Sequence, residues 1–149
     1  MTPYRVPRQV LVYLHRGGKF LLLLRTPELG GFWQGVTGAP DHGETDLDAA
    51  IREVREETGF DVARTIRPVG YRYEIRPGPD SLYWSSLYEP GVEAVPEEVY
   101  LAEAGEGEPR LQPLEHIEFR WCSVDEALEL LYYENNRVAL ARAAGLLTT

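Results

Sequence analysis

The stretch that decides the fold is residues 38–60, GAPDHGETDLDAAIREVREETGF. Its second part carries the signals of an amphipathic helix over residues 45–58. Thr45 is a good N-cap, Asp48 follows at the spacing of a capping box, and Gly59 stands where a helix-ending glycine belongs. Apolar residues recur at helical spacing and predict a core-facing side, formed by Leu47, Ala50, Ile51 and Val54.

The opposite side of this predicted helix is acidic. Glu53, Glu56 and Glu57 lie at i, i+3 and i+4, so their carboxylates share one face. Glu44 adds a carboxylate just before the N-cap, and Arg52 precedes Glu56 by four residues and can orient it. A solvated acidic face is one interpretation of this pattern. A magnesium site is the other, because Mg²⁺ prefers several oxygen ligands and bridges them to phosphates.

The rest of the chain alternates strand-like runs with turn signals. Gly17 and Gly18 separate two runs of β-forming residues and predict a hairpin. Ser123 is a predicted N-cap, with Glu126 at the capping-box position. The expected elements are strands at 9–15, 19–25, 33–37, 64–74, 81–88, 99–102 and 117–122, a loop at 26–31, a turn at 76–80, and helices at 45–58, 125–133 and 135–146. This order predicts an α/β sandwich with a mixed sheet flanked by helices.

Composition and charge narrow the function classes. The length of 149 residues predicts one domain over residues 1–149, and a hydrophobic fraction of 44% is enough for a sizeable core. The net charge of −9 disfavours a nucleic-acid partner. No apolar run reaches the roughly 18 residues of a membrane span, and the single Cys122 suits a reducing compartment, so we expect a soluble, cytoplasmic protein with no membrane partner. Residues 89–109 hold seven acidic residues and no basic one, which favours a largely solvated loop region.

Residues 38–60 resemble the box of the Nudix hydrolase family, G-x5-E-x7-R-E-U-x-E-E-x-G-U, in which U is apolar. Every defined position is filled, by Gly38, Glu44, Arg52, Glu53, Val54, Glu56, Glu57, Gly59 and Phe60. Ala39 stands where the family usually has a second glycine, which lies outside the defined pattern. The resemblance implies an α/β/α sandwich in which the box forms a loop-helix-loop.

The same resemblance implies an activity and a cofactor. Nudix hydrolases cleave a nucleoside diphosphate linked to another group, by attack of water at a phosphorus. Mg²⁺, with Mn²⁺ as a substitute, neutralises the charge of the phosphates. Glu56 and Glu57 match the principal metal ligands, Glu53 matches a further ligand or the base, and Arg52 matches the orienting arginine.

Stretches outside the box resemble the branch of the family that acts on deoxyadenosine triphosphate and dihydroneopterin triphosphate. They are residues 32–44, FWQGVTGAPDHGE, residues 115–121, EHIEFRW, and a late Asn-Asn-Arg at 135–137. The likeness implies release of pyrophosphate and a monophosphate, with Glu115 as a metal ligand or base. The residues that would then contact substrate are Arg5, Arg25, Thr37, Gly38 and Asn135.

Several residues also have a plainer interpretation. Glu115 could be a solvated acid, and Arg25 could mark the exit of a strand to solvent. His42 and His116 could be general bases, although lone histidines in loops are more often bystanders. A flat ring of the substrate could stack on Phe32, Trp33, Tyr13 or Tyr83.

Rival functions share either the box or the fold. A dinucleoside polyphosphate hydrolase or an ADP-ribose pyrophosphatase would carry the same box. A non-hydrolytic nucleotide-binding regulator would share the fold but typically lose box carboxylates, and this chain has all of them. The expected partner in each case is a small nucleoside or pterin phosphate. The physiological substrate, the general base, the number of metal ions and the choice between monomer and homodimer stay open.

Overall fold

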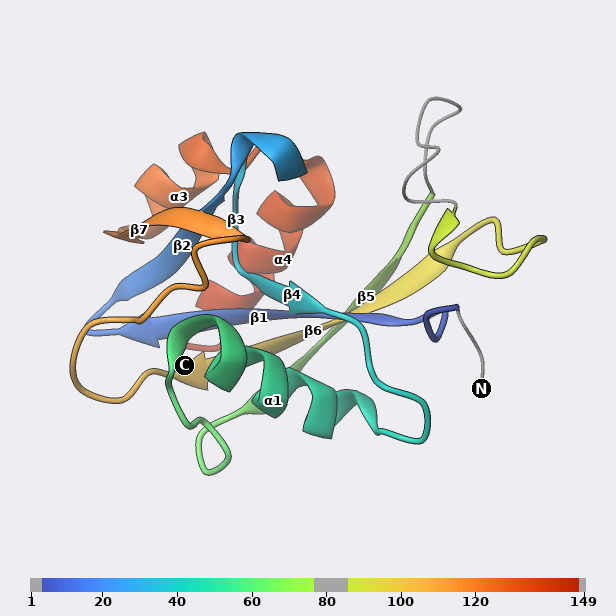
Figure 1. Cartoon of the computed structure of the whole chain (residues 1–149). Helices are drawn as coiled ribbons and strands as arrows, with labels where there is room; N and C mark the ends of the chain where they lie inside the picture. Colours follow the sequence, from blue (N-terminus) through green and yellow to red (C-terminus); the bar gives the residue numbers. More distant parts are fainter. Residues whose placement is uncertain (1–3, 77–85, 148–149) are drawn as a thin grey trace.

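The computed structural model describes residues 4–76 and 86–147. It contains a mixed sheet of seven strands within these residues, with helices on both faces (Figure 1). The strands are β1 (Gln9–Arg16), β2 (Lys19–Arg25), β3 (Trp33–Gln34), β4 (Val36–Gly38), β5 (Arg67–Ile75), β6 (Val95–Glu103) and β7 (His116–Cys122). The order is β3-β2-β1-β6-β5, with β4 pairing β1 and β7 pairing β2. Helix α1 (Asp46–Thr58) covers one face, and α3 (Val124–Leu130) and α4 (Glu134–Gly145) cover the other. The predicted α/β sandwich is therefore confirmed.

Strand β1 forms the centre of the sheet because its residues are buried on both faces. Val10, Val12 and Leu14 point into the core under α1, while Leu11 and Tyr13 point into the core under α3 and α4. A two-residue turn at Gly17 and Gly18 returns the chain into β2, and both glycines have positive φ angles, 56° and 80°. β6 runs parallel to β1, which ties the second half of the chain to the first.

Helix α1 forms as its local signals predict. The Thr45 side chain accepts a hydrogen bond from the Asp48 amide at 3.1 Å, and Gly59 ends the helix in the left-handed conformation with a φ of 84°. The core-facing side differs at one position: Leu47 is exposed, and Ala49 is buried instead. The buried face near the C-terminal end of the helix also includes a carboxylate, Glu57.

The acidic tract at residues 89–109 differs most from expectation. Much of it is not solvated loop but β6, a strand of nine residues between β1 and β5. Glu97 is buried in this strand with 2% of its surface exposed. Its carboxylate accepts hydrogen bonds from the Gln9 amide, at 2.6 Å, and from the Tyr73 hydroxyl. These partners, remote in sequence, satisfy the buried charge.

Smaller differences have local causes. β5 begins at Arg67 rather than at residue 64, because the Ile66 amide closes a turn onto the Val62 carbonyl at 2.9 Å. α3 ends at Leu130 rather than at residue 133, because Leu131 leaves the helix to bridge with Trp33. Its capping box at Ser123 forms as predicted. The predicted loop at 26–31 contains a short 3₁₀ turn, Pro27–Leu29.

The predicted strand at 81–88 and the turn at 76–80 fall largely outside the described residues, and the described residues 86–88 are not a strand. None of the described helices is both long enough and apolar enough to cross a membrane.

Candidate metal centre

Arg52 organises the box carboxylates. Its guanidinium pairs with both oxygens of Glu44, at 2.9 and 3.0 Å, which makes a bidentate contact. It also donates to Glu53 at 3.0 Å, to Glu56 at 3.1 Å and to the Ala39 carbonyl at 3.1 Å. The Arg52 hydrogen bonds lower the pKa of Glu44. One planar cation therefore joins α1 to the loop before it and orients three carboxylates.

Glu53 lies directly against Gly38, at the end of β4. A Cβ atom on Gly38 would fall 2.2 Å from the Glu53 Cδ and 2.5 Å from its Oε1. The absence of a side chain at residue 38 thus gives the Glu53 carboxylate its place. Burial raises the pKa of Glu53, while its bonds with Glu57 and Arg52 lower it.

Glu57 is the most deeply buried carboxylate of the box, with 3% of its surface exposed. Its Oε2 atom is buried and has no hydrogen-bond partner among the described residues. Burial raises the pKa of Glu57 well above its ordinary value, and the nearby carboxylates of Glu53 and Glu115 raise it further. A buried, unpartnered carboxylate oxygen carries a large desolvation cost unless a cation or proton compensates it.

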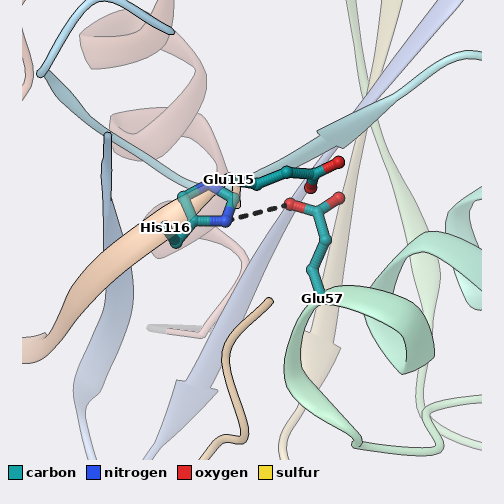
Figure 2. Close-up of side chains that lie close together, drawn as sticks. All are labelled: Glu57, Glu115 and His116. Carbon is teal, nitrogen blue, oxygen red and sulfur yellow. Dashed lines mark ion pairs between the residues drawn. The ribbon is translucent and has the colours of Figure 1, made fainter. Parts of the chain in front are cut away.

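The segment before β7 brings Glu115 to this carboxylate. The Gln112 side chain donates to the Glu56 carbonyl at 3.0 Å, and the Glu115 carbonyl accepts from the Thr26 amide at 2.9 Å. The segment is thereby held between α1 and the end of β2. Figure 2 shows the result: the carboxylates of Glu57 and Glu115 point toward each other, and the His116 ring faces Glu57. Donor atoms of these three residues lie within 4.8 Å of one another.

His116 is a component of the site that the sequence analysis undervalued. It is buried, its Nδ1 atom lies 3.7 Å from the Glu57 Oε1, and its Nε2 atom lies 3.3 Å from the Gln34 amide nitrogen. Burial, with the charge of Arg25, lowers the pKa of His116 to about 4, so the ring is neutral at pH 7. The adjacent Glu115 was the one sequence signal that pointed to it.

The carboxylates open onto a cavity of about 280 Å³. Its lining residues are Glu53, Glu56, Glu57, Gln112, Leu114 and Glu115. Four of these six are acidic, which gives the cavity a strong negative charge. A phosphate could approach it only with cations between the two.

Arg25 and Thr37 lie beside this group. Arg25 pairs with His116 in the β2–β7 ladder, and its charge lowers the pKa values of Glu57 and His116. Its guanidinium also donates to the Leu29 carbonyl at 3.0 Å and lies 5.6 Å from the centre of the Phe32 ring. The Thr37 hydroxyl lies 3.4 Å from the Gln34 amide that contacts His116.

Two predicted substrate contacts lie apart from the cavity lining. Arg5 lines a separate cavity of about 130 Å³, with Pro7, His42, Glu89 and Val92. Asn135 is an exposed residue of the first turn of α4. Its neighbour Asn136 is the one tied into the fold, through a hydrogen bond to the Tyr73 hydroxyl at 3.0 Å.

The candidate stacking aromatics also separate. Tyr13 is fully buried and donates to the Asn136 carbonyl at 2.8 Å, so it presents no face to a ligand. The guanidinium of Arg120 lies 5.1 Å from the centre of the half-buried Trp33 ring. Phe32 is half-buried and lies next to Arg25, while Tyr83 is outside the described residues.

Comparison with known proteins identifies the family. The NUDIX domain profile matches residues 5–143. A protein named dihydroneopterin triphosphate diphosphatase from Escherichia coli K12 is 30% identical over 142 residues, which cover 92% of this chain and 91% of the relative. The rat bis(5'-nucleosyl)-tetraphosphatase (asymmetrical) is 31% identical over 125 residues, with coverages of 80% and 74%.

Two further similarities complete the comparison. The solved structure of the E. coli dihydroneopterin triphosphate pyrophosphohydrolase has a TM-score of 0.81 at 27% identity, and the match covers 97% of this chain and 99% of that one. A protein named octanoyltransferase from Myxococcus xanthus is 36% identical over 126 residues, but the match spans only 32% of its length. With the family profile covering most of its length and three of the box glutamates lining one cavity, this chain belongs to the Nudix family, whose hydrolases act on phosphoanhydride bonds.

Proposed function

We propose that this protein is a magnesium-dependent pyrophosphohydrolase of a pterin or nucleoside triphosphate, acting as a single domain over residues 1–149. The observation that carries the proposal is Glu57, a buried carboxylate with an unpartnered oxygen at a cavity lined by three further glutamates. Similarity to the E. coli dihydroneopterin triphosphate diphosphatase over nearly the whole chain supports the substrate class.

The residues fit a divalent cation. The cavity supplies hard oxygen donors on a packed helix, and the buried carboxylates repel one another without a cation. Glu53, Glu56, Glu57 and Glu115 would hold it, with Mg²⁺ as the expected ion and Mn²⁺ as a substitute. When bound, the ion would neutralise phosphate charge and make water more acidic.

The protein's own groups then have distinct roles. Arg52 donates hydrogen bonds to Glu53 and Glu56 and so holds their carboxylates in place. It therefore positions metal ligands without touching the reacting atoms. Glu53 and Glu115 are the candidates to accept a proton from the attacking water, because both line the cavity and carboxylates are competent bases. Arg25, at the edge of the cluster, would bind a phosphate oxygen, and Thr37 and Gly38 would also contact the substrate.

The substrate ring requires an apolar, flat partner. Phe32 is the candidate because it lies next to Arg25. Arg5 and Asn135 would bind parts of the substrate away from the reacting phosphates, as their positions outside the carboxylate cavity require. The net charge of −9 favours a small phosphorylated ligand over nucleic acid, and a cytoplasmic location agrees with the single, buried Cys122.

A product analysis tests this proposal. The purified chain is incubated with dihydroneopterin triphosphate, deoxyadenosine triphosphate and a dinucleoside tetraphosphate, each with Mg²⁺. Pyrophosphate and a monophosphate from a triphosphate are the expected products. The second candidate, dinucleoside polyphosphate hydrolysis, rests on the similarity to the rat tetraphosphatase, and release of ATP from the dinucleotide as the main reaction would favour it. Binding without turnover of any of these would support a regulator instead.

A further inference from the structure

The buried imidazole of His116 lacks a partner on the side that faces the carboxylates. With 2% of its surface exposed, it begins β7 immediately after Glu115. Its Nδ1 atom and the Glu57 Oε2 atom are both buried, and neither has a hydrogen-bond partner among the residues that the structure describes. Two adjacent orphan polar atoms are costly unless one missing group satisfies both.

The spacing of the His116 ring and the Glu57 carboxylate suits a shared metal ion better than a hydrogen bond. The His116 Nδ1 lies 3.7 Å from the Glu57 Oε1, which is too long for a good N–H···O bond. Two atoms that each lie about 2.0–2.2 Å from one ion are at most about 4.4 Å apart. The 3.7 Å separation falls inside this limit. The donor atoms of Glu57, Glu115 and His116 all lie within 4.8 Å of one another, a bound only slightly above the limit of about 4.4 Å.

The far side of the ring contacts a side-chain amide. The His116 Nε2 lies 3.3 Å from the Gln34 side chain, which in turn lies 3.4 Å from the Thr37 hydroxyl. Metal binding at Nδ1 requires the ring proton on Nε2, and therefore a Gln34 amide turned so that its oxygen accepts from the Nε2–H; this contact then fixes the ring orientation and leaves Nδ1 available for a ligand. Nδ1 is then directed at the two carboxylates, as Figure 2 shows.

We propose that His116 is a nitrogen ligand of the metal centre, together with Glu57 and Glu115, and that it strengthens the binding of Mn²⁺ more than that of Mg²⁺. The inference rests on the proposed function only in placing a divalent ion at this cavity. Mg²⁺ demands oxygen ligands, whereas imidazole nitrogen binds first-row transition ions well. A Nudix box alone provides carboxylates, so the imidazole would be a contribution of β7.

The direct test is the ligand sphere of bound Mn²⁺. Metal-free full-length protein is loaded with one equivalent of Mn²⁺, and pulsed EPR records hyperfine coupling to ¹⁴N. The chain has three histidines, so a His15→Gln/His42→Gln double variant leaves His116 as the only imidazole. We expect nitrogen coupling of directly bound imidazole in the wild type and in this double variant.

Calorimetry with His116→Gln supplies a second measurement. A glutamine can keep a contact to Gln34 but offers no imidazole nitrogen. We expect the nitrogen coupling to disappear and the Mn²⁺ affinity to fall by at least the roughly 10–100-fold that losing the partner of a metal ligand costs, with a change of less than about threefold for Mg²⁺. Thermal unfolding confirms that the variant is folded.

Stoichiometric Mn²⁺ binding without nitrogen coupling in the wild type would overturn the inference. So would an equal loss of affinity for both ions in His116→Gln, because His116 would then act only by positioning Glu57. Turnover of triphosphates is measured separately with Mg²⁺. Turnover without nitrogen coupling would refute the histidine ligand alone, and nitrogen coupling without turnover would refute the proposed reaction alone.

Discussion

The Glu53 side chain occupies the space in which a Cβ atom on Gly38 would lie. In a Gly38→Ala variant the new Cβ would lie 2.2 Å from the Glu53 Cδ, whereas ordinary contacts start at 3.4 Å. The difference requires the carboxyl carbon to retreat by about 1.2 Å. That movement would also stretch the 3.0 Å hydrogen bond from Arg52 to Glu53. The variant therefore perturbs the position of a proposed metal ligand without removing any functional group.

The expected magnitude follows from this displacement. A misplacement of about 1 Å at a reacting centre can cost about 10²-fold in rate, or roughly 2.7 kcal/mol of transition-state stabilisation. We expect kcat/KM for the triphosphate substrate to fall by about that factor. The effect on folding should be smaller, because the Glu53 side chain borders an open cavity into which it can move.

The assay is pyrophosphate release at saturating Mg²⁺, with the fraction of folded protein measured by circular dichroism. Gly105→Ala is the matched control, since its new Cβ would have no neighbour within 4 Å. It should keep wild-type activity. Wild-type kcat/KM in Gly38→Ala would refute the reasoning, and so would an activity loss wholly explained by unfolding.

Three further predictions concern other charged groups. Arg52→Lys should lower the free energy of unfolding by roughly 1–3 kcal/mol in urea titrations, because an ammonium cannot reproduce the bidentate contact with Glu44. Glu57→Gln should reduce turnover by roughly 10²–10³-fold and raise the melting temperature of the metal-free protein, since it removes a buried charge. It should also abolish the increase of roughly 5–10 °C expected for wild type at a Mg²⁺ concentration 100 times the Kd. Burial raises the pKa of Glu97 in the folded protein above its ordinary value of 4.5. As the pH rises past 4.5, the unfolded chain therefore loses this proton before the folded chain does. The unfolding free energy then falls with pH by up to about 1.4 kcal/mol per unit, until the folded pKa is reached. Glu97→Gln should flatten this slope in urea titrations between pH 4.5 and 8, and a slope equal to that of the control Glu98→Gln would contradict the assignment.

Local signals allowed much of the box to be predicted from the sequence. The N-cap at Thr45, the glycine at residue 59 and the three glutamates of one helix face depend on neighbours within a few turns. The same holds for the hairpin at Gly17, whose conformation is set by two adjacent glycines. Such features need no knowledge of the tertiary structure.

The features that were missed depend on partners far apart in the chain. From the sequence, Glu97 is interpreted as a solvated acid because Gln9, its amide partner, lies 88 residues away. From the sequence, His116 is interpreted as a bystander. Glu57 comes close to its ring only when β7 pairs with β2 and the segment before β7 packs on α1. Hydropathy and spacing carry no information on such contacts, so the carboxylates of the site could be predicted but not its imidazole.

The central claim is that the protein hydrolyses a triphosphate at the cavity around Glu57 and uses a divalent ion to do so. Its most direct test is hydrolysis of dihydroneopterin triphosphate with Mg²⁺ in ¹⁸O-labelled water, with both products identified by mass spectrometry for the wild type and Glu57→Gln. We predict equimolar pyrophosphate and monophosphate from the wild type, with one ¹⁸O atom in one of the two, and almost none from the variant. Stepwise release of inorganic phosphate, or equal turnover by the two proteins, would contradict the account.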